Sequence, residues 1–152
     1  MEKSSSSLFF ILIFMTTCYM YSQENNRHPR KSYTEFNVGF ATNKHWEKSG
    51  GVMPGASYLF GKTHYYKSGL IIDNQIGFAL PVILTAKIGG GFKLNETEFI
   101  SGIRIWPMNY FTQINTPFKK GKLVLTVERF MAYNDTMFPN NYFSVGYRWH
   151  KK

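Results

Sequence analysis

Cysteine is almost missing from this chain of 152 residues, in which Cys18 is the single example. Cys18 lies in an apolar N-terminal segment, so the body of the chain has no thiol at all. This excludes a disulfide framework, a cysteine nucleophile and a cysteine metal site from that body. A secreted domain without disulfides must draw its stability from a sizeable core or from the closure of a sheet.

Acidic residues are also scarce, and a helical apolar period is absent. There are 9 aspartates and glutamates against 18 lysines and arginines, which gives a net charge of +9, while aromatic residues make up 18% of the chain. After residue 23 no stretch repeats its apolar residues every 3.6 positions. A helix-rich cytosolic enzyme is therefore disfavoured.

The N-terminal segment MEKSSSSLFFILIFMTTCYMYSQ has the pattern of a secretory signal peptide. It carries Lys3, an apolar run Leu8–Met15 that is too short to span a bilayer as a helix, and then small and polar residues. We interpret residues 1–23 as the signal peptide and residues 24–32 as a polar leader. The alternative is a short membrane anchor or a core helix.

The remaining residues, 33–152, are interpreted as one β-barrel domain. Apolar and polar residues alternate with a period of two, and clusters of Gly, Pro, Asn and Lys interrupt the alternation. This pattern predicts eight strands, at about 33–42, 52–60, 68–78, 82–94, 97–106, 109–115, 122–132 and 142–150.

The two faces of these strands differ sharply. One face carries large apolar side chains, such as Phe36 and Val38 in the first strand. The other face is rich in glycine and carries charges of both signs: Glu35, Asp73, Glu98, Glu128, Lys87, Arg104 and Arg148. Mixed charge on one face indicates a structural network in which each charge is compensated.

A soluble barrel would turn its apolar face inward. Three features favour the inverse arrangement. The apolar face holds more aromatic residues than a small barrel can enclose, the glycines suit a narrow lumen, and the charges compensate one another. The sequence thus predicts an all-β, eight-stranded antiparallel up-and-down barrel that is transmembrane and has a polar, packed lumen. The alternative is a soluble exported barrel or sandwich that binds an apolar ligand within its aromatic face.

Lys87 interrupts the apolar run VILTAKIGGGF, and an unpaired buried ammonium would be costly. Turns at 79–81 and 95–96 predict which residues face one another on neighbouring strands: Asp73 with Lys87, Gln75 with Thr85, Lys93 with Glu98, and Lys87 with Arg104. We therefore expect Lys87 to point into the lumen and to pair with Asp73.

The signal peptide, the eight short alternating strands and the last strand YFSVGYRW together resemble the small outer-membrane β-barrels of Gram-negative bacteria. The resemblance implies a location in the outer membrane and contact with membrane lipids, including lipopolysaccharide. It also implies that the insertion machinery reads an aromatic residue near the end of the last strand, here Trp149, although His150–Lys152 follow it. A structural or envelope-integrity role without a cofactor is expected, and an open pore is not, because eight strands enclose only side chains.

Basic residues gather at the end that this topology places in the periplasm: Arg27, Arg30, Lys31, Lys62, Lys67, Lys119, Lys120, Lys122, Lys151 and Lys152. They either contact lipid phosphates or serve solubility. The outward connections, at about 43–51, 79–81, 106–108 and 133–141, include two that are short for extracellular loops.

Arg129 shares its face with apolar residues such as Val127. Two interpretations are open. Either Arg129 lies near the outer headgroups and pairs with a lipopolysaccharide phosphate, or a bulge near Glu128 turns it aside.

Catalytic, metal and nucleic-acid functions find little support in the sequence. Lipid A deacylases carry His-x-Ser on one strand, and none of the four histidines here has Ser two positions later. His45 and Glu47 are too few for a metal site. The signal peptide and the position of the basic residues at turns argue against nucleic-acid binding. We therefore expect no enzyme activity, no metal and no nucleic-acid partner.

Overall fold

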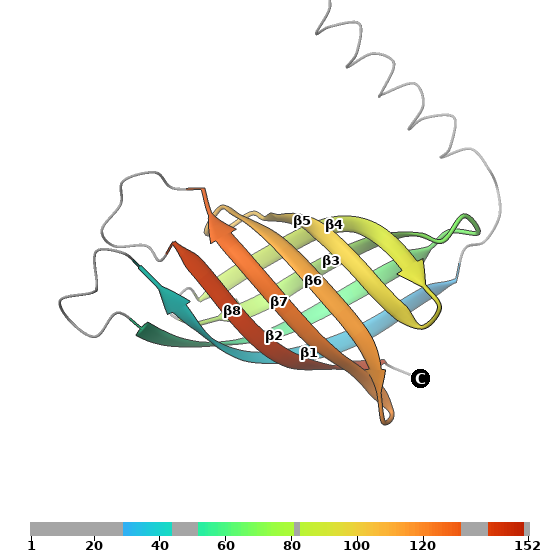
Figure 1. Cartoon of the computed structure of the whole chain (residues 1–152), viewed down its shortest axis with the longest axis horizontal. Helices are drawn as coiled ribbons and strands as arrows, with labels where there is room; N and C mark the ends of the chain where they lie inside the picture. Colours follow the sequence, from blue (N-terminus) through green and yellow to red (C-terminus); the bar gives the residue numbers. More distant parts are fainter. Residues whose placement is uncertain (1–28, 44–51, 81–82, 132–139, 151–152) are drawn as a thin grey trace, which may run out of the picture.

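The computed structural model describes residues 29–43, 52–80, 83–131 and 140–150, and within them every regular element is a β-strand. The predicted signal peptide and residues 24–28 of the predicted leader lie outside the described residues. The strands are β1 (Arg30–Thr42), β2 (Val52–Tyr65), β3 (Leu70–Ala79), β4 (Leu84–Leu94), β5 (Thr97–Arg104), β6 (Asn109–Phe118), β7 (Gly121–Phe130) and β8 (Asn141–His150) (Figure 1). No helix in this part of the chain has the length and apolarity needed to cross a membrane.

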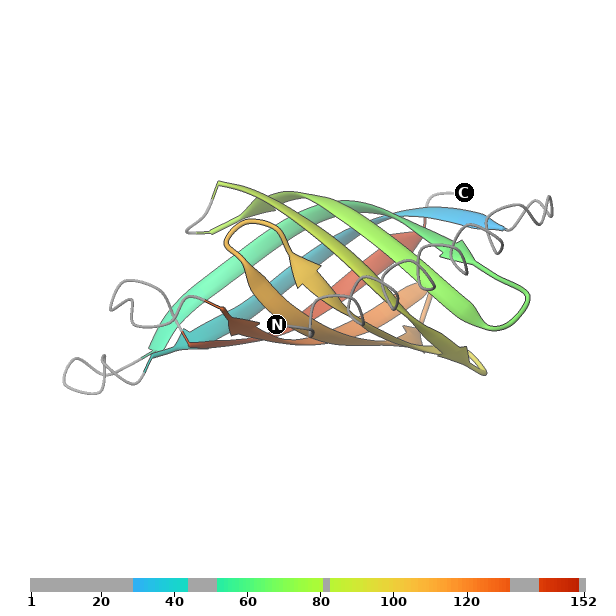
Figure 2. The same cartoon turned by 90° about the horizontal axis from the view of Figure 1, so that it is seen from above.

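The eight strands form one closed antiparallel barrel in chain order. Each strand pairs with the next, and β8 pairs with β1 over the register Tyr33–His150 to Thr42–Asn141. Two roughly perpendicular views show the strands tilted around a common axis (Figures 1 and 2). The prediction of an eight-stranded antiparallel barrel is confirmed.

Three strands extend several residues further than the sequence predicted. β1 begins at Arg30, inside the predicted leader, β2 runs to Tyr65, and β6 runs to Phe118. The pattern of outward apolar residues in β2 ends before the strand does, because Lys62 is exposed on the outer side. The backbone ladder nevertheless continues, since Thr63 pairs with Lys31 on one side and Asp73 on the other.

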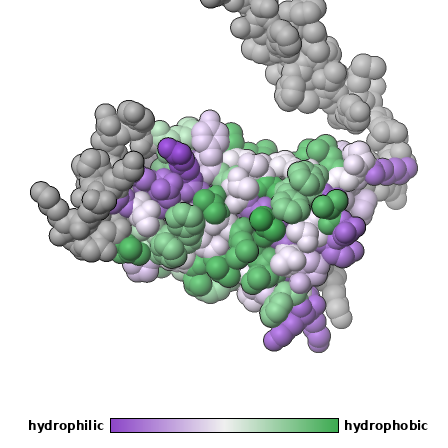
Figure 3. All heavy atoms as spheres, in the orientation of Figure 1, coloured by the Kyte–Doolittle hydropathy of each residue, from purple (hydrophilic) through white to green (hydrophobic). Residues whose placement is uncertain are grey.

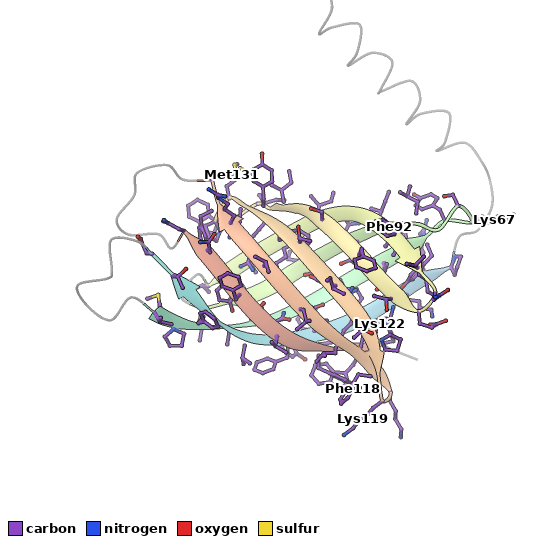
Figure 4. The ribbon with its side chains drawn as sticks, viewed as in Figure 1. Lys67, Phe92, Phe118, Lys119, Lys122 and Met131 are labelled. Carbon is purple, nitrogen blue, oxygen red and sulfur yellow. The ribbon has the colours of Figure 1, made fainter. Side chains whose placement is uncertain are left out.

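The two ends of the barrel are different. At the turn end, tight turns join β2 to β3, β4 to β5 and β6 to β7, and β1 begins and β8 ends there. Lys67 and Lys119 lie at this end, whereas Met131 lies at the opposite loop end (Figure 4). Asn95 and Lys119 adopt positive φ values of 55° and 52° in two of these turns, and Gly69 adopts 82° in the third.

The charged face of the sheet lies inside the barrel, and the apolar face lies outside. Glu35 and Arg148 are 0% exposed, whereas the outward residues Phe36 and Val145 are 42% and 50% exposed. Apolar residues cover much of the middle of the outer surface, and hydrophilic residues gather toward its two ends (Figure 3). A soluble barrel would have the opposite arrangement.

One predicted register is confirmed and another is wrong. Between β4 and β5, Lys93 faces Glu98 and Lys87 faces Arg104, as expected. Between β3 and β4, however, Lys87 faces Gln75, and Asp73 faces Gly89. The predicted partners Asp73–Lys87 and Gln75–Thr85 are therefore incorrect by two residues. A shift of two leaves every side chain on the same face, so alternation cannot distinguish the two registers.

Glycines on the inner side allow neighbouring strands to approach closely. A Cβ atom on Gly91 would overlap the carbonyl oxygen of Phe99 on the adjacent strand. The preceding residue, Gly90, points outward, and the nearest atom to a Cβ there would be the Ile71 oxygen at 3.8 Å. The glycine at position 91 is thus required by the packing, and the one at position 90 is not.

Candidate functional site: the buried charge network

Eight charged side chains fill the interior, and their charges sum to zero. Each is at most 9% exposed. We call this set the buried charge network, and it consists of the acids Glu35, Asp73, Glu98 and Glu128 and the bases Lys87, Arg104, Lys122 and Arg148. Seven of these were singled out from the sequence, and the structure places all seven inside the barrel.

Arg148 is the centre of the middle part of the network. Its Nη2 atom lies 2.7 Å from Glu35 Oε2 and 3.4 Å from Asp73 Oδ2, and its Nε donates to the same Glu35 oxygen at 2.8 Å. The guanidinium also lies over the ring of Tyr33, 3.6 Å from the centroid. One fully buried cation is therefore held by two carboxylates and an aromatic face.

Asp73 accepts three further hydrogen bonds from neutral groups. The hydroxyls of Tyr33 and Thr63 donate to it at 2.7 and 2.6 Å, and the amide of Gln75 donates at 2.8 Å. Because Thr63 is on β2 and Tyr33 on β1, this carboxylate connects three strands. Such satisfaction of its lone pairs offsets part of the cost of burying it.

A second group lies near the turn end, around Glu98. Its carboxylate pairs with Lys122 and accepts hydrogen bonds from Tyr65 Oη at 2.5 Å and Asn115 Nδ2 at 3.1 Å. Lys122 was expected to belong to the basic rim, and that expectation is wrong because the side chain is 9% exposed and points inward. Lys122 and Glu128 lie an even number of residues apart on β7, so their side chains point to the same face. The sequence interpretation missed this signal.

A third group lies near the loop end, around Glu128. Lys87 Nζ is 2.7 Å from Glu128 Oε1, Arg104 Nη2 is 2.6 Å from the same oxygen, and Asn109 donates to Oε2 at 3.1 Å. Lys87 also lies 5.1 Å from the ring centroid of Phe111. Lys87 therefore points into the lumen as expected, but its carboxylate partner comes from β7, across the lumen, and not from Asp73.

The interior holds few groups suited to catalysis or metal binding. No cluster of three or more metal-ligating side chains occurs among the residues that the structure describes, and His45 and Glu47 lie outside them. Glu98 and Glu128 belong to separate groups, each with its own cation. In this arrangement the buried acids and bases neutralise one another's charge.

Arg129 lies on the opposite, outer side of β7. It is exposed near the loop end and faces Tyr110 and Asn141 on the neighbouring strands. Pairing continues without interruption through Glu128 and Arg129, so the interpretation that a bulge turns Arg129 aside is wrong.

The aromatic outer face does not line an internal ligand cavity. Phe36, Phe78 and Phe92 are 42 to 56% exposed on the outside of the barrel. The interior is instead occupied by the buried charge network together with Tyr33, Phe111 and Ile100. The arrangement required by a soluble barrel that holds an apolar ligand within its aromatic face is therefore not the one observed.

A scan against protein-family models and searches of curated proteins and of solved structures each find no match to this chain. Assignment of a function therefore depends on the geometry of the barrel itself.

Proposed function

We propose that this protein is a transmembrane β-barrel of the Gram-negative outer membrane with a structural, envelope-stabilising role. The observation that carries the proposal is the inversion of the two faces. Large apolar side chains are exposed on every strand of the barrel, while a neutral set of charges is buried inside it. In lipid this arrangement satisfies both faces at once.

The size of the exposed apolar surface supports a lipid environment. Soluble monomers rarely expose contiguous apolar patches larger than a few hundred Å². Here outward rows of apolar residues join across neighbouring strands, for example Val38, Val145 and Leu125 on β1, β8 and β7. All three are 44 to 52% exposed. Water would be a poor solvent for such a face.

The dimensions and the aromatic residues fit the same environment. Most strands contain 8 to 11 residues, close to the roughly 9–11 that a tilted transmembrane strand needs. Aromatic contacts lie toward both ends: Phe40 contacts Phe143 near the loop end, while Tyr147 contacts both Phe118 and Trp149 near the turn end. Transmembrane barrels carry such aromatic girdles at both interfaces.

The filled interior supports a barrel that is closed to diffusion. Arg148, Tyr33 and Phe111 are among the largest fully buried side chains, and they project into the space that a pore would need. An eight-stranded barrel is just wide enough to be filled by side chains. We therefore assign the protein neither a channel nor a catalytic role.

Contacts with the envelope follow from the exposed ends. Arg129 is exposed beside Tyr110 near the loop end, and we propose that it pairs there with a lipopolysaccharide phosphate. Outward-facing Trp149 is the last residue but one of β8, and we propose that the outer-membrane insertion machinery reads it during assembly.

The proposal is tested by expressing the full-length chain with its own N-terminal segment. A folded membrane barrel will be recovered from the outer-membrane fraction and will change its mobility on a denaturing gel when the sample is boiled. Reconstitution into planar bilayers should produce no steady conductance. A monomer that stays in solution without detergent contradicts the membrane assignment, and a stable conductance contradicts the closed lumen.

A further inference from the structure

A groove on the outside of β1, β2 and β3 combines an apolar part with a polar, cationic part. It has a volume of about 450 Å³, within the roughly 300–1,000 Å³ of small-molecule sites. Its outward-facing lining comes from Ser32, Phe60, Lys62, His64, Asn74 and Ile76, of which Ser32 and His64 are half-buried.

The register arranges these residues in rows that change from cationic to apolar along the barrel axis. Nearest the turn end, Arg30 faces His64. In the next row Lys62 lies between Ser32 and Asn74. In the row after that Phe60 faces Ile76, and both are exposed, at 42% and 57%. This change from cationic to apolar residues takes place within a few residues of one strand. It matches the change from charged headgroup to apolar acyl chain in a lipid.

The cations of the groove have no acidic partner. Arg30 and Lys62 both act electrostatically on His64, so positive charges are held close together. Within the described residues, the Lys62 ammonium and the Asn74 amide have no hydrogen-bond or ion-pair partner. The single exposed acid in this part of the chain is Glu96, and it pairs with Lys93 in the β4–β5 turn. Asp73, which also acts electrostatically on His64, is buried inside the barrel and paired with Arg148. Among the described residues, no exposed carboxylate near the groove therefore offsets the attraction of its cations for an anion.

The charged residues that do not belong to the buried charge network also carry a positive net charge. Because that network is neutral, all of the excess positive charge of the described residues lies outside it. Seven of the eight cations there are at the turn end, namely Arg30, Lys31, Lys62, Lys67, Lys93, Lys119 and Lys120, and Arg129 alone is near the loop end. The groove is the place where this charge adjoins an apolar recess.

We propose that this groove binds one anionic glycerophospholipid. Its phosphate accepts hydrogen bonds from Lys62, Asn74 and Ser32, with Arg30 nearby, and an acyl chain packs along Phe60 and Ile76. The inference rests on the proposed membrane location and deepens it by assigning a lipid site to the turn end, where β1 begins and β8 ends. A second, unattached phosphate would satisfy the cations but would leave Phe60 and Ile76 uncovered.

The test measures lipid retention by native mass spectrometry. The mature barrel is refolded in a nonionic detergent and titrated separately with phosphatidylglycerol, phosphatidylethanolamine and inorganic phosphate. We expect one phosphatidylglycerol to be retained in preference to phosphatidylethanolamine, and no retention of free phosphate. Loss of two surface cations should weaken binding roughly 30-fold in the double variant Arg30→Gln/Lys62→Gln.

A matched variant separates a site from general attraction. Lys119→Gln/Lys120→Gln removes the same charge from the β6–β7 turn, away from the groove, and should retain the lipid with unchanged affinity. Ile76→Asn keeps the charge of the groove unchanged but removes the apolar contact for the acyl chain, and it should also lose the lipid. Equal weakening in both double variants, or retention of phosphate alone, overturns the site.

The boiled and unboiled gel is run on the same samples. A barrel that shifts its mobility but retains no phosphatidylglycerol refutes the groove and leaves the membrane assignment intact. A chain that is folded and monomeric without detergent refutes the membrane assignment itself, and the lipid site with it.

Discussion

The inner and outer faces of this barrel are made by the same strands, yet they place different demands on their residues. On the inner face each charge has particular partners, such as Arg148 with Glu35 and Asp73. On the outer face, residues such as Val145 are surrounded by other exposed apolar side chains and have no specific partner requirement. The inner face therefore depends on identity and geometry, whereas the outer face depends mainly on apolarity.

The largest effect is expected from breaking the centre of the buried charge network. Arg148→Met leaves Glu35 and Asp73 buried without their cation, and it should lower the free energy of unfolding by about 3–5 kcal/mol. The measurement is urea unfolding in lipid vesicles, followed by tryptophan fluorescence. Adding Glu35→Gln and Asp73→Asn to the same variant should restore part of the loss.

The matched control for this experiment is Arg129→Met on the outer face. Arg129 is exposed near the loop end, and a charge near the interface changes stability by only about 0–1 kcal/mol. Equal losses in Arg148→Met and Arg129→Met would show that the inner partners contribute nothing specific.

The next prediction tests whether the outer face is surrounded by lipid. Val145→Arg introduces a charge among Val38 and Leu125 and should cost about 2–4 kcal/mol in a bilayer. Thr116→Arg, on the outer side next to the β6–β7 turn, should cost about 0–1 kcal/mol. The same unfolding experiment in vesicles compares the two variants, and indistinguishable values would contradict burial of this face in lipid.

A smaller effect is expected from two adjacent glycines that point to opposite faces. Gly91→Ala forces a Cβ atom into the backbone of β5 and should cost about 1–3 kcal/mol. Gly90→Ala meets only ordinary contacts on the outside and should stay within about 0.5 kcal/mol. A thermal melt followed by circular dichroism measures both variants, and a larger loss for Gly90→Ala would reverse the assignment of the faces at this point.

The smallest effect belongs to the exposed ion pair at the turn end. Lys93 Nζ lies 3.7 Å from Glu96 Oε2, and Glu96 is 76% exposed, so Glu96→Gln should change stability by less than about 1 kcal/mol. The identical substitution Glu98→Gln, two residues later but inside the barrel, should cost clearly more because it disturbs Lys122 and Tyr65. Urea midpoints of the two variants give the comparison directly.

Much of this arrangement could be predicted from the two-residue period. The number of strands and the presence of Glu35, Lys87 and Arg148 on one face follow from the alternation of polar and apolar residues, and the β4–β5 register follows from the predicted turn at 95–96. Lys122 was missed because its position beside a turn suggested a solvent-exposed rim, although it has the same parity as Glu128. The β3–β4 register was missed because a shift of two residues preserves that parity.

The sequence by itself determined the strands and the separation into two faces, because alternation is a local property of the chain. Only closure of the barrel decided which charges meet. Lys87 on β4 reaches Glu128 on β7, and Arg148 on β8 reaches Asp73 on β3, between strands that are not neighbours in the sheet. Such contacts across a lumen depend on strand number, tilt and register together, and no local pattern encodes them.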